Sequence, residues 1–445
     1  MKNLTEGNIT KLIISFSMPL LFGNIFQLLY NLVDTRIVGE ALGENAIGAL
    51  GATSAINSVI VGFLMGLTTG FSLVTARHFG AKDMDKTRKT VAKALVLGLG
   101  TSIVFTVISL VFLDSLLKSL NTPAEIYTQA KDYIFIILAG MTATTLYNIF
   151  ASVLRAVGDT ISPLIFLIIS TFINIGLDFL FIYSFHWGVK GAAFATVIAQ
   201  VVSAVLCFIY ILKKHNNLLP KKADFAIDLK MAGDMYASGV SMGLMISLVG
   251  IGTVVMQGAI NGFGTKIVIA HTTARKISEI YFLPISVFGS AAATMAGQNY
   301  GAGNIKRVKQ TIWKATLLTW GWSALMTVVT FLFTPQLANL ITGITDNEIL
   351  KIVDKYMKIN ISFYAVLTIV IIFRNGLQGM NDKISPILSS LLELVGKVVV
   401  AKALAPRLGY FGIMISEPLV WIGMAVILGI GFIVTLRRNR VIIRR

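Results

Sequence analysis

Residues 171–183 read TFINIGLDFLFIY, an apolar run that contains one amide, Asn174, and one carboxylate, Asp178. The run lies in a hydrophobic segment long enough to cross a bilayer, where an ionisable side chain is costly unless another group compensates it. Because Asn174 and Asp178 are four residues apart, a helix places them on one face, about one turn from each other. The two side chains could hold one cation or one proton, which makes this face the first candidate for a functional site.

The chain around this run is apolar from one end to the other. Of its 445 residues, 55% are hydrophobic and only 13% are charged, whereas about 25% of the residues in soluble proteins are charged. Apolar blocks of roughly 20 residues recur, which predicts an all-α polytopic membrane protein rather than a barrel of short alternating strands. We expect twelve transmembrane helices, near residues 12–35, 50–76, 91–113, 132–154, 162–184, 190–212, 236–260, 267–295, 312–333, 357–380, 384–405 and 410–436.

The basic residues indicate the topology. The formal net charge is +17, and Lys and Arg concentrate in alternate connections, at 76–90, 213–230 and 303–310, and in the C-terminal tail. The positive-inside rule makes these connections cytoplasmic. We therefore predict a multi-pass protein of the cytoplasmic membrane with both termini in the cytoplasm, and we attribute the charge to topology rather than to nucleic-acid binding.

The two halves of the chain repeat one another. HFGAKDMDKTRKT at 78–90 returns as NYGAGNIKRVKQT at 299–311, and LRAVGDTISP at 154–163 returns as LQGMNDKISP at 377–386. Both pairs are offset by about 222 residues, a spacing too constant for chance matches.

This repeat predicts the domains. We expect an N-terminal six-helix lobe at 1–215, a cytoplasmic linker at 216–230 and a C-terminal six-helix lobe at 231–445. Since six is an even number, both lobes enter the membrane in the same orientation, which predicts two bundles related by a pseudo-twofold axis along the membrane normal.

Ionisable residues within the expected spans are distributed unevenly between the halves. The N-terminal half has two carboxylates, Asp34 and Asp178, and no base. In the C-terminal half, the spacings of Arg275 with Glu279 and of Glu393 with Lys397 predict ion pairs along single helices. We expect that set to form a charge network that locks its lobe: Arg275, Lys276, Glu279, Arg374, Glu393, Lys397 and Glu417.

No base neutralises the two N-terminal carboxylates, so a proton or a bound cation must compensate their charge. A coupling-ion site requires this property. Asp34 lies near the outer end of the first span, and Asp178 lies about 7.5 Å from the outer end of the fifth. The sixth span places Thr196 at similar depth. An interfacial role for Asp34 and a structural hydrogen bond for Asp178 remain alternatives. We expect four residues to bind a proton or a sodium ion: Asp34, Asn174, Asp178 and Thr196.

Three further polar residues are candidates for binding a substrate. Gln27 and Tyr30 precede Asp34 by two turns and one turn of the first span, and Asn148 lies late in the fourth. They could line a cavity for an amphipathic cation, although hydrogen bonding between helices is the alternative for each. The four histidines show no metal-ligand spacing, so we expect no metal-catalytic site.

Prolines are expected to bend some of the spans. Pro19, Pro284 and Pro418 lie inside predicted helices, where proline removes a backbone hydrogen bond and clashes with the preceding turn. Pro19 matters most, because it shares its helix with Asp34.

Together these features resemble the multidrug and toxic compound extrusion (MATE) family over essentially the whole chain. The resemblance implies a V-shaped pair of six-helix bundles that exports organic cations in exchange for protons or sodium ions. It is closest to the DinF-like side of the family and related bacterial exporters. The matching segments are SMPLLFGNIFQLLYNLVDTRIVG (17–39), LRAVGDTISP, NIGLDFLFI (174–182), GVKGAAFATVIAQ (188–200) and LQGMNDKISP.

The resemblance also implies roles for single residues. Pro19 matches the proline about which the first span is proposed to bend, and Gln27 and Tyr30 fall where the family's substrate pocket has polar and aromatic residues. A NorM-like sodium site in the second lobe is not expected, because span seven has no acid and span ten offers only Arg374. The DinF-like ion site corresponds here to Asp34, Asn174, Asp178 and Thr196.

We therefore predict a secondary antiporter, not an enzyme, that exports organic cations, drugs or toxic metabolites. We expect a monomer in membrane lipid, with a small amphipathic cation as substrate and no cofactor beyond the coupling ion. The alternative is a flippase for lipid-linked oligosaccharides of the same superfamily, which needs a large cationic cavity for pyrophosphate. A membrane enzyme or receptor would need a loop or cavity motif that the sequence does not show.

Overall fold

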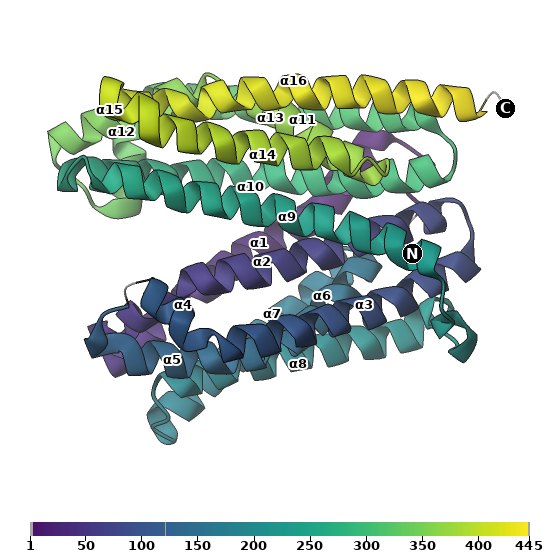
Figure 1. Ribbon diagram of the computed structural model, residues 1–445, viewed down its shortest axis with the longest axis horizontal. Helices are drawn as coiled ribbons and strands as arrows, with labels where there is room; N and C mark the ends of the chain where they lie inside the picture. The colour runs from purple at the N-terminus through teal and green to yellow at the C-terminus, as the bar shows by residue number, and fades with distance from the viewer. Residues whose placement is uncertain (1–2, 121, 444–445) are drawn as a thin grey trace. The chain divides into compact units, whose positions relative to one another are not determined.

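The computed structural model describes residues 3–120 and 122–443, and this part of the chain is helical with no strand. The predicted all-α membrane fold is confirmed (Figure 1). Within these residues, ten helices are long and apolar enough to cross a membrane, or there are up to twelve spans if each of two bent helix pairs forms one. The latter number is the one expected from the sequence.

In the first sequence half, each predicted span coincides with a helix or a helix pair. The helices are α1 (Ile9–Leu42), α2 (Glu44–Gly80), α3 (Met84–Val111), α4 (Leu113–Ser119), α5 (Ala124–Ala139), α6 (Met141–Ala156), α7 (Ile161–Asp178) and α8 (Val189–Lys214).

The second half follows the same order. Its helices are α9 (Leu229–Asn261), α10 (Thr265–Gly301), α11 (Ile305–Thr342), α12 (Asn347–Ile361), α13 (Tyr364–Gly379), α14 (Ile384–Val399), α15 (Ala405–Leu408) and α16 (Tyr410–Ile443).

Two spans bend at equivalent places in the two copies, and neither bend is at a proline. Helices α5 and α6 meet at 45° next to Gly140, and α12 and α13 meet at 53° across Ser362 and Phe363. At Gly140 an added Cβ would lie 2.7 Å from a methyl carbon of Val197, so α8 packs directly against the bend. The predicted kinking prolines Pro19, Pro284 and Pro418 all lie inside helices that continue past them.

A π-helical segment follows α7 and another follows α14. They span Phe179–Ser184, directly after Asp178, and Val400–Leu404, shortly after Lys397. Such segments are rare and frequently occur at functional sites. Here each of them begins within one turn of an ionisable residue in the membrane.

The described chain divides into two compact units. The first is formed by Met18–Ile246, and the second by Leu4–Ser17 with the residues from Ser247 on. The division falls within α1 and α9, although the longest connection between long helices coincides with the linker predicted at 216–230.

The start of α9 belongs to the first unit because glycines allow α2 and α9 to cross closely. A Cβ added at Gly66 would lie 2.7 Å from the Cα of Gly243, and one at Gly239 would lie 2.9 Å from the carbonyl oxygen of Leu67. Small residues at such crossings let backbones approach in membranes.

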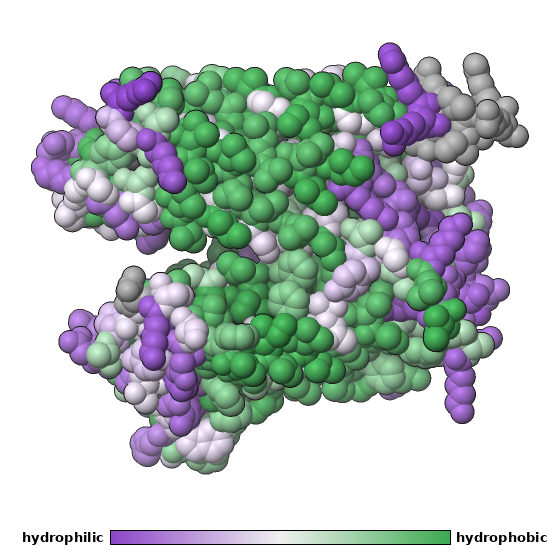
Figure 2. All heavy atoms as spheres, in the orientation of Figure 1, coloured by the Kyte–Doolittle hydropathy of each residue, from purple (hydrophilic) through white to green (hydrophobic). Residues whose placement is uncertain are grey.

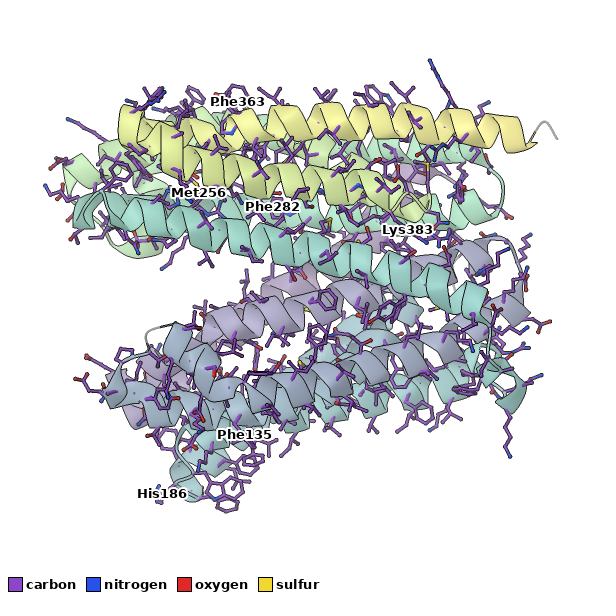
Figure 3. The ribbon with its side chains drawn as sticks, in the orientation of Figure 1. Phe135, His186, Met256, Phe282, Phe363 and Lys383 are labelled. Carbon is purple, nitrogen blue, oxygen red and sulfur yellow. The ribbon has the colours of Figure 1, made fainter. Side chains whose placement is uncertain are left out.

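Apolar side chains point outward along the helices, as expected in lipid. Val111 is 71% exposed and Phe172 is 68% exposed. In Figure 2 the sides of the long helices are hydrophobic, whereas hydrophilic residues gather near the helix ends, and Phe135 projects from α5 in the same way (Figure 3).

Candidate functional site

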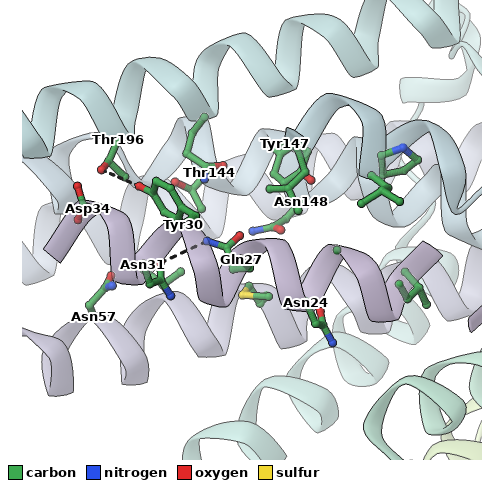
Figure 4. Close-up of a pocket in the computed structure, with 18 of the residues that line it drawn as sticks. Asn24, Gln27, Tyr30, Asn31, Asp34, Asn57, Thr144, Tyr147, Asn148 and Thr196 are labelled. Atoms are coloured by element: carbon green, nitrogen blue, oxygen red, sulfur yellow. Dashed lines mark hydrogen bonds between the residues drawn. The ribbon is translucent and has the colours of Figure 1, made fainter. Parts of the chain in front are cut away.

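The first unit contains a cavity of about 420 Å³ along one face of α1 (Figure 4). Side chains spaced three or four residues apart share a helix face. On this face of α1, the lining side chains from Asn24 to Asp34 are polar. Asp34 marks one end of the row in Figure 4 and Asn24 the other. The residues of α1 that line the cavity are Pro19, Leu20, Gly23, Asn24, Gln27, Tyr30, Asn31 and Asp34.

The three residues predicted to bind substrate all line this cavity. Gln27 donates to Asn31 Oδ1 at 3.5 Å, and the Tyr30 hydroxyl lies 3.1 Å from Thr196 Oγ1. Asn148 reaches the cavity from α6 and is 9% exposed. The spacing of Asn24 and Asn31 from Gln27 could have placed both on this face of α1. For residues of other helices, the sequence does not show which helix face borders the cavity. The further polar residues that line it are Asn24, Asn31, Asn57, Tyr133, Thr144, Tyr147, Arg155 and Gln200.

The predicted ion-site residues lie together at the Asp34 end of the cavity. Asp34 is 8% exposed, and Asn174 and Asp178 are fully buried behind it. The carboxyl groups of Asp34 and Asp178 lie close enough to interact. Two ionised carboxylates in a buried pair repel one another, so this arrangement favours one proton shared by the pair.

Asn174 and Thr196 complete the cluster. The Asn174 amide is oriented so that its nitrogen donates to Asp178 Oδ2 at 3.1 Å, while its oxygen accepts from the backbone N–H of Thr196 at 3.1 Å. The amide therefore presents a donor, not an oxygen ligand, to the carboxyl pair. Oδ1 of Asp34 and Oδ1 of Asp178 are buried and have no partner in the part of the chain that is described.

This donor set fits a proton better than a metal ion. Sodium and other hard cations need several converging oxygens, but the Asn174 oxygen faces a backbone donor. Among residues 3–120 and 122–443, no three His, Cys, Asp or Glu side chains are grouped so as to hold a metal.

The first unit has a base beside its cavity that the sequence analysis did not single out. The expected span ends at 154, whereas α6 continues to Ala156, so Arg155 lies in the last turn of α6 and lines the cavity. The repeat could have drawn attention to Arg155, because it pairs Arg155 with Gln378, and Gln378 lies inside the span expected at 357–380.

The second unit contains the predicted charge network, with one pairing corrected. Lys397 Nζ lies 2.9 Å from Glu393 Oε1, as its spacing predicted, and Arg374 lies 3.4 Å from Glu393 Oε2. Arg275 was expected to pair along its own helix with Glu279. Instead it contacts Glu417 on α16 at 2.9 Å, because the guanidinium reaches across to the neighbouring helix.

The network borders a second cavity of about 210 Å³. Tyr356 donates to Glu417 Oε2 at 3.1 Å, and Arg374 Nε donates to Ser389 at 3.2 Å. Glu279 is exposed and lines this cavity, whereas Lys276 is exposed and does not. Glu393 and Glu417 therefore each touch at least one base.

The fold and the polar membrane cavity define a polytopic α-helical membrane transporter. The profile of the MatE family matches the chain twice, at residues 19–180 and 240–401. The chain therefore belongs to the MatE family, as the sequence resemblance implied. The two matches also confirm that the halves are related copies.

Individual relatives agree with this assignment. The probable multidrug resistance protein YpnP of Bacillus subtilis (strain 168) is 30% identical over 69% of this chain and 68% of its own length. The probable multidrug resistance protein NorM of Thermotoga maritima is 24% identical over 94% of this chain and 89% of its own. An FAD transporter of Shewanella oneidensis is 23% identical over 94% and 92%.

A solved structure extends the match to three dimensions. The crystal structure of a MATE protein in the bent conformation superposes with a TM-score of 0.90 at 25% identity, and covers 99% of this chain and 98% of that one.

Proposed function

We propose that the protein is a secondary antiporter that exports organic cations, drugs or toxic metabolites in exchange for protons. The observation that carries the proposal is the pair of neighbouring carboxyl groups, Asp34 and Asp178, at one end of a polar membrane cavity. Relatives named for multidrug resistance support the export of drugs. The positive-inside pattern supports a cytoplasmic membrane location with both termini in the cytoplasm.

The geometry supports a mechanism in which the proton and the cationic substrate exclude one another from the site at Asp34. Asp34 lines the cavity and also belongs to the carboxyl pair, so a cationic substrate near Asp34 favours its ionised form. A proton entering the pair removes that attraction and favours release. Tyr30 extends the link, because its hydroxyl contacts Thr196 while its ring faces the cavity.

Protons are favoured over sodium because of Asn174. Its amide nitrogen faces Asp178, and an N–H donor cannot coordinate a cation. Sodium would require that amide to turn and lose its bond to the Thr196 backbone. We assign the charge network of the second unit a stabilising role and no role in coupling. We also propose that the protein works as a monomer in membrane lipid, since each of the two cavities described above is complete within a single unit.

The test is ethidium transport in proteoliposomes with a pH gradient or a sodium gradient imposed separately. We expect the pH gradient alone to drive transport, and Asp34→Asn and Asp178→Asn each to abolish it. Asp132→Asn is a matched control, because Asp132 is in the same unit and pairs with Lys190 at 3.3 Å on the surface. Transport driven by sodium alone, or normal transport by both Asp variants, would refute the mechanism.

A further inference from the structure

The cavity of the first unit carries a base as well as an acid. Arg155 lines it from the last turn of α6, and Asp34 lines it from α1. An ionisable side chain facing a membrane cavity is a functional candidate by default, because placing it there is costly.

Acid and base lie at opposite ends of the cavity. A Cβ added at Gly23 would lie 3.6 Å from Leu164 near the start of α7, whereas Asp34 contacts Asp178 at the end of α7. Helices α1 and α7 therefore run side by side in the same direction. Arg155 lies shortly before Ile161, the first residue of α7, so it belongs to the end of the cavity at Pro19. Pro19 is about 22 Å along α1 from Asp34.

Among the described residues, the Arg155 guanidinium has no acidic partner. It donates a hydrogen bond to Ser152 Oγ, 2.8 Å away on the same helix. Arginines of other helices do pair with carboxylates: Arg77 with Asp234, Arg275 with Glu417 and Arg374 with Glu393. A guanidinium has five donors, so Arg155 retains several for a ligand.

The repeat shows that the fold does not require this arginine. In the first copy Asp159 caps α7 by accepting from Ser162 N at 3.0 Å and Ser162 Oγ at 2.7 Å. In the second copy Asp382 accepts from Ser385 N at 3.1 Å and Ser385 Oγ at 2.7 Å. The turn is thus the same, although the second copy has Gln378 in place of the arginine.

We propose that Arg155 binds an acidic group, a carboxylate or a phosphate, on the substrate. Guanidinium groups bind such anions through paired charge-assisted hydrogen bonds. The substrates then include amphipathic zwitterions and anions, with the apolar body against Tyr147 and the acidic group at Arg155. This inference rests on the proposed export function and names its substrate class.

A matched pair of fluorescent dyes tests the proposal. Rhodamine 110 has a free carboxylate, and rhodamine 123 is its methyl ester. Binding to purified protein in nanodiscs is followed by fluorescence polarisation for wild type, Arg155→Gln, which copies the second repeat, and Arg155→Lys. Arg36→Gln is the control, because it removes the same charge from a side chain that is 80% exposed and does not line the cavity.

We expect Arg155→Gln to weaken rhodamine 110 binding about tenfold or more while rhodamine 123 binding changes less than about twofold. Arg155→Lys should retain most of the wild-type preference for rhodamine 110 over rhodamine 123, and Arg36→Gln should retain all of it. Riboflavin 5′-phosphate compared with riboflavin then tells a phosphate preference from a carboxylate preference. The proposal is overturned if the wild type binds rhodamine 123 and Arg155→Gln changes neither the difference between rhodamine 110 and its ester nor the difference between riboflavin 5′-phosphate and riboflavin. If the wild type binds none of the dyes, the export function itself fails.

Discussion

The carboxyl groups of Asp34 and Asp178 lie close enough to interact, although the two residues come from the first and fifth predicted spans. Asp34 faces the cavity, whereas Asp178 is fully buried behind it. Only Asp34 can therefore meet a substrate directly. In the proposed mechanism the buried Asp178 adjusts the charge of Asp34, so that one proton controls how strongly the cavity attracts a cation.

The Tyr30 hydroxyl connects this pair to the substrate cavity, so its removal should affect coupling more than binding. Tyr30→Phe deletes the 3.1 Å contact with Thr196 but keeps the ring in the cavity. A neutral hydrogen bond contributes about 1 kcal/mol. We therefore expect proton-driven ethidium transport to fall about fivefold, with ethidium affinity changed less than about twofold. Tyr183→Phe, at an exposed tyrosine, is the control; equal losses in both variants would contradict this role for Tyr30.

Much of this arrangement could be predicted from the sequence. The spacing of Asn174 and Asp178 and their depth relative to Asp34 and Thr196 predicted that the four side chains would lie together, and they do. Their role in coupling stays a prediction. The helical period and the position of a residue along its span depend on the local sequence alone. The placement of these four side chains could therefore be inferred without knowing how the helices pack.

The remaining features depend on how helices pack. The pairing of Arg275 with Glu417 joins α10 to α16, and helical spacing contains no information about a partner on another helix. The bend at Gly140 depends on Val197 of α8. Arg155 was missed for a different reason, since hydropathy locates the end of a span only to within a few residues.

The close crossing of α2 and α9 predicts that a single methyl group at Gly66 destabilises the first unit. Gly66→Ala would bring Cβ to 2.7 Å from the Cα of Gly243, where only backbone can yield. Overpacking of this kind costs about 1–3 kcal/mol, so the midpoint of thermal unfolding in detergent should fall. Gly51→Ala, on the same helix with nothing within 4 Å, should leave the midpoint unchanged or raise it. An unchanged midpoint for Gly66→Ala would mean that the helices do not cross so closely.

Glu393 should matter more to stability than either of the bases beside it. Glu393→Gln removes the carboxylate that pairs with both Arg374 and Lys397, and breaking a buried pair costs about 3–5 kcal/mol. Lys397→Met should cost less, because Arg374 still neutralises Glu393. Glu348→Gln is the exposed control, with an expected change below about 1 kcal/mol. Unfolding in mixed micelles measures all three; similar losses for Glu393→Gln and Lys397→Met would contradict the shared countercharge.

The connection between α8 and α9 should loosen at acidic pH. The backbone N–H of Lys221 at 2.8 Å and the Arg88 side chain at 3.3 Å lower the pKa of Asp224 below its usual value. A depressed pKa means that the stabilisation is complete above the ordinary aspartate pKa of about 3.9 and is lost as the pH falls through the lower folded value.

Hydrogen exchange of residues 216–228, corrected for intrinsic rates, should therefore increase between pH 6 and pH 3 in the wild type. Asp224→Asn should exchange fast at both values, because its neutral amide cannot replace the carboxylate held by Arg88. Asp132→Asn, away from this connection, should keep the wild-type pH dependence. A pH-independent exchange rate in the wild type would show that Lys93, which also contacts the carbonyls of Phe225 and Ala226, holds the connection without help from Asp224.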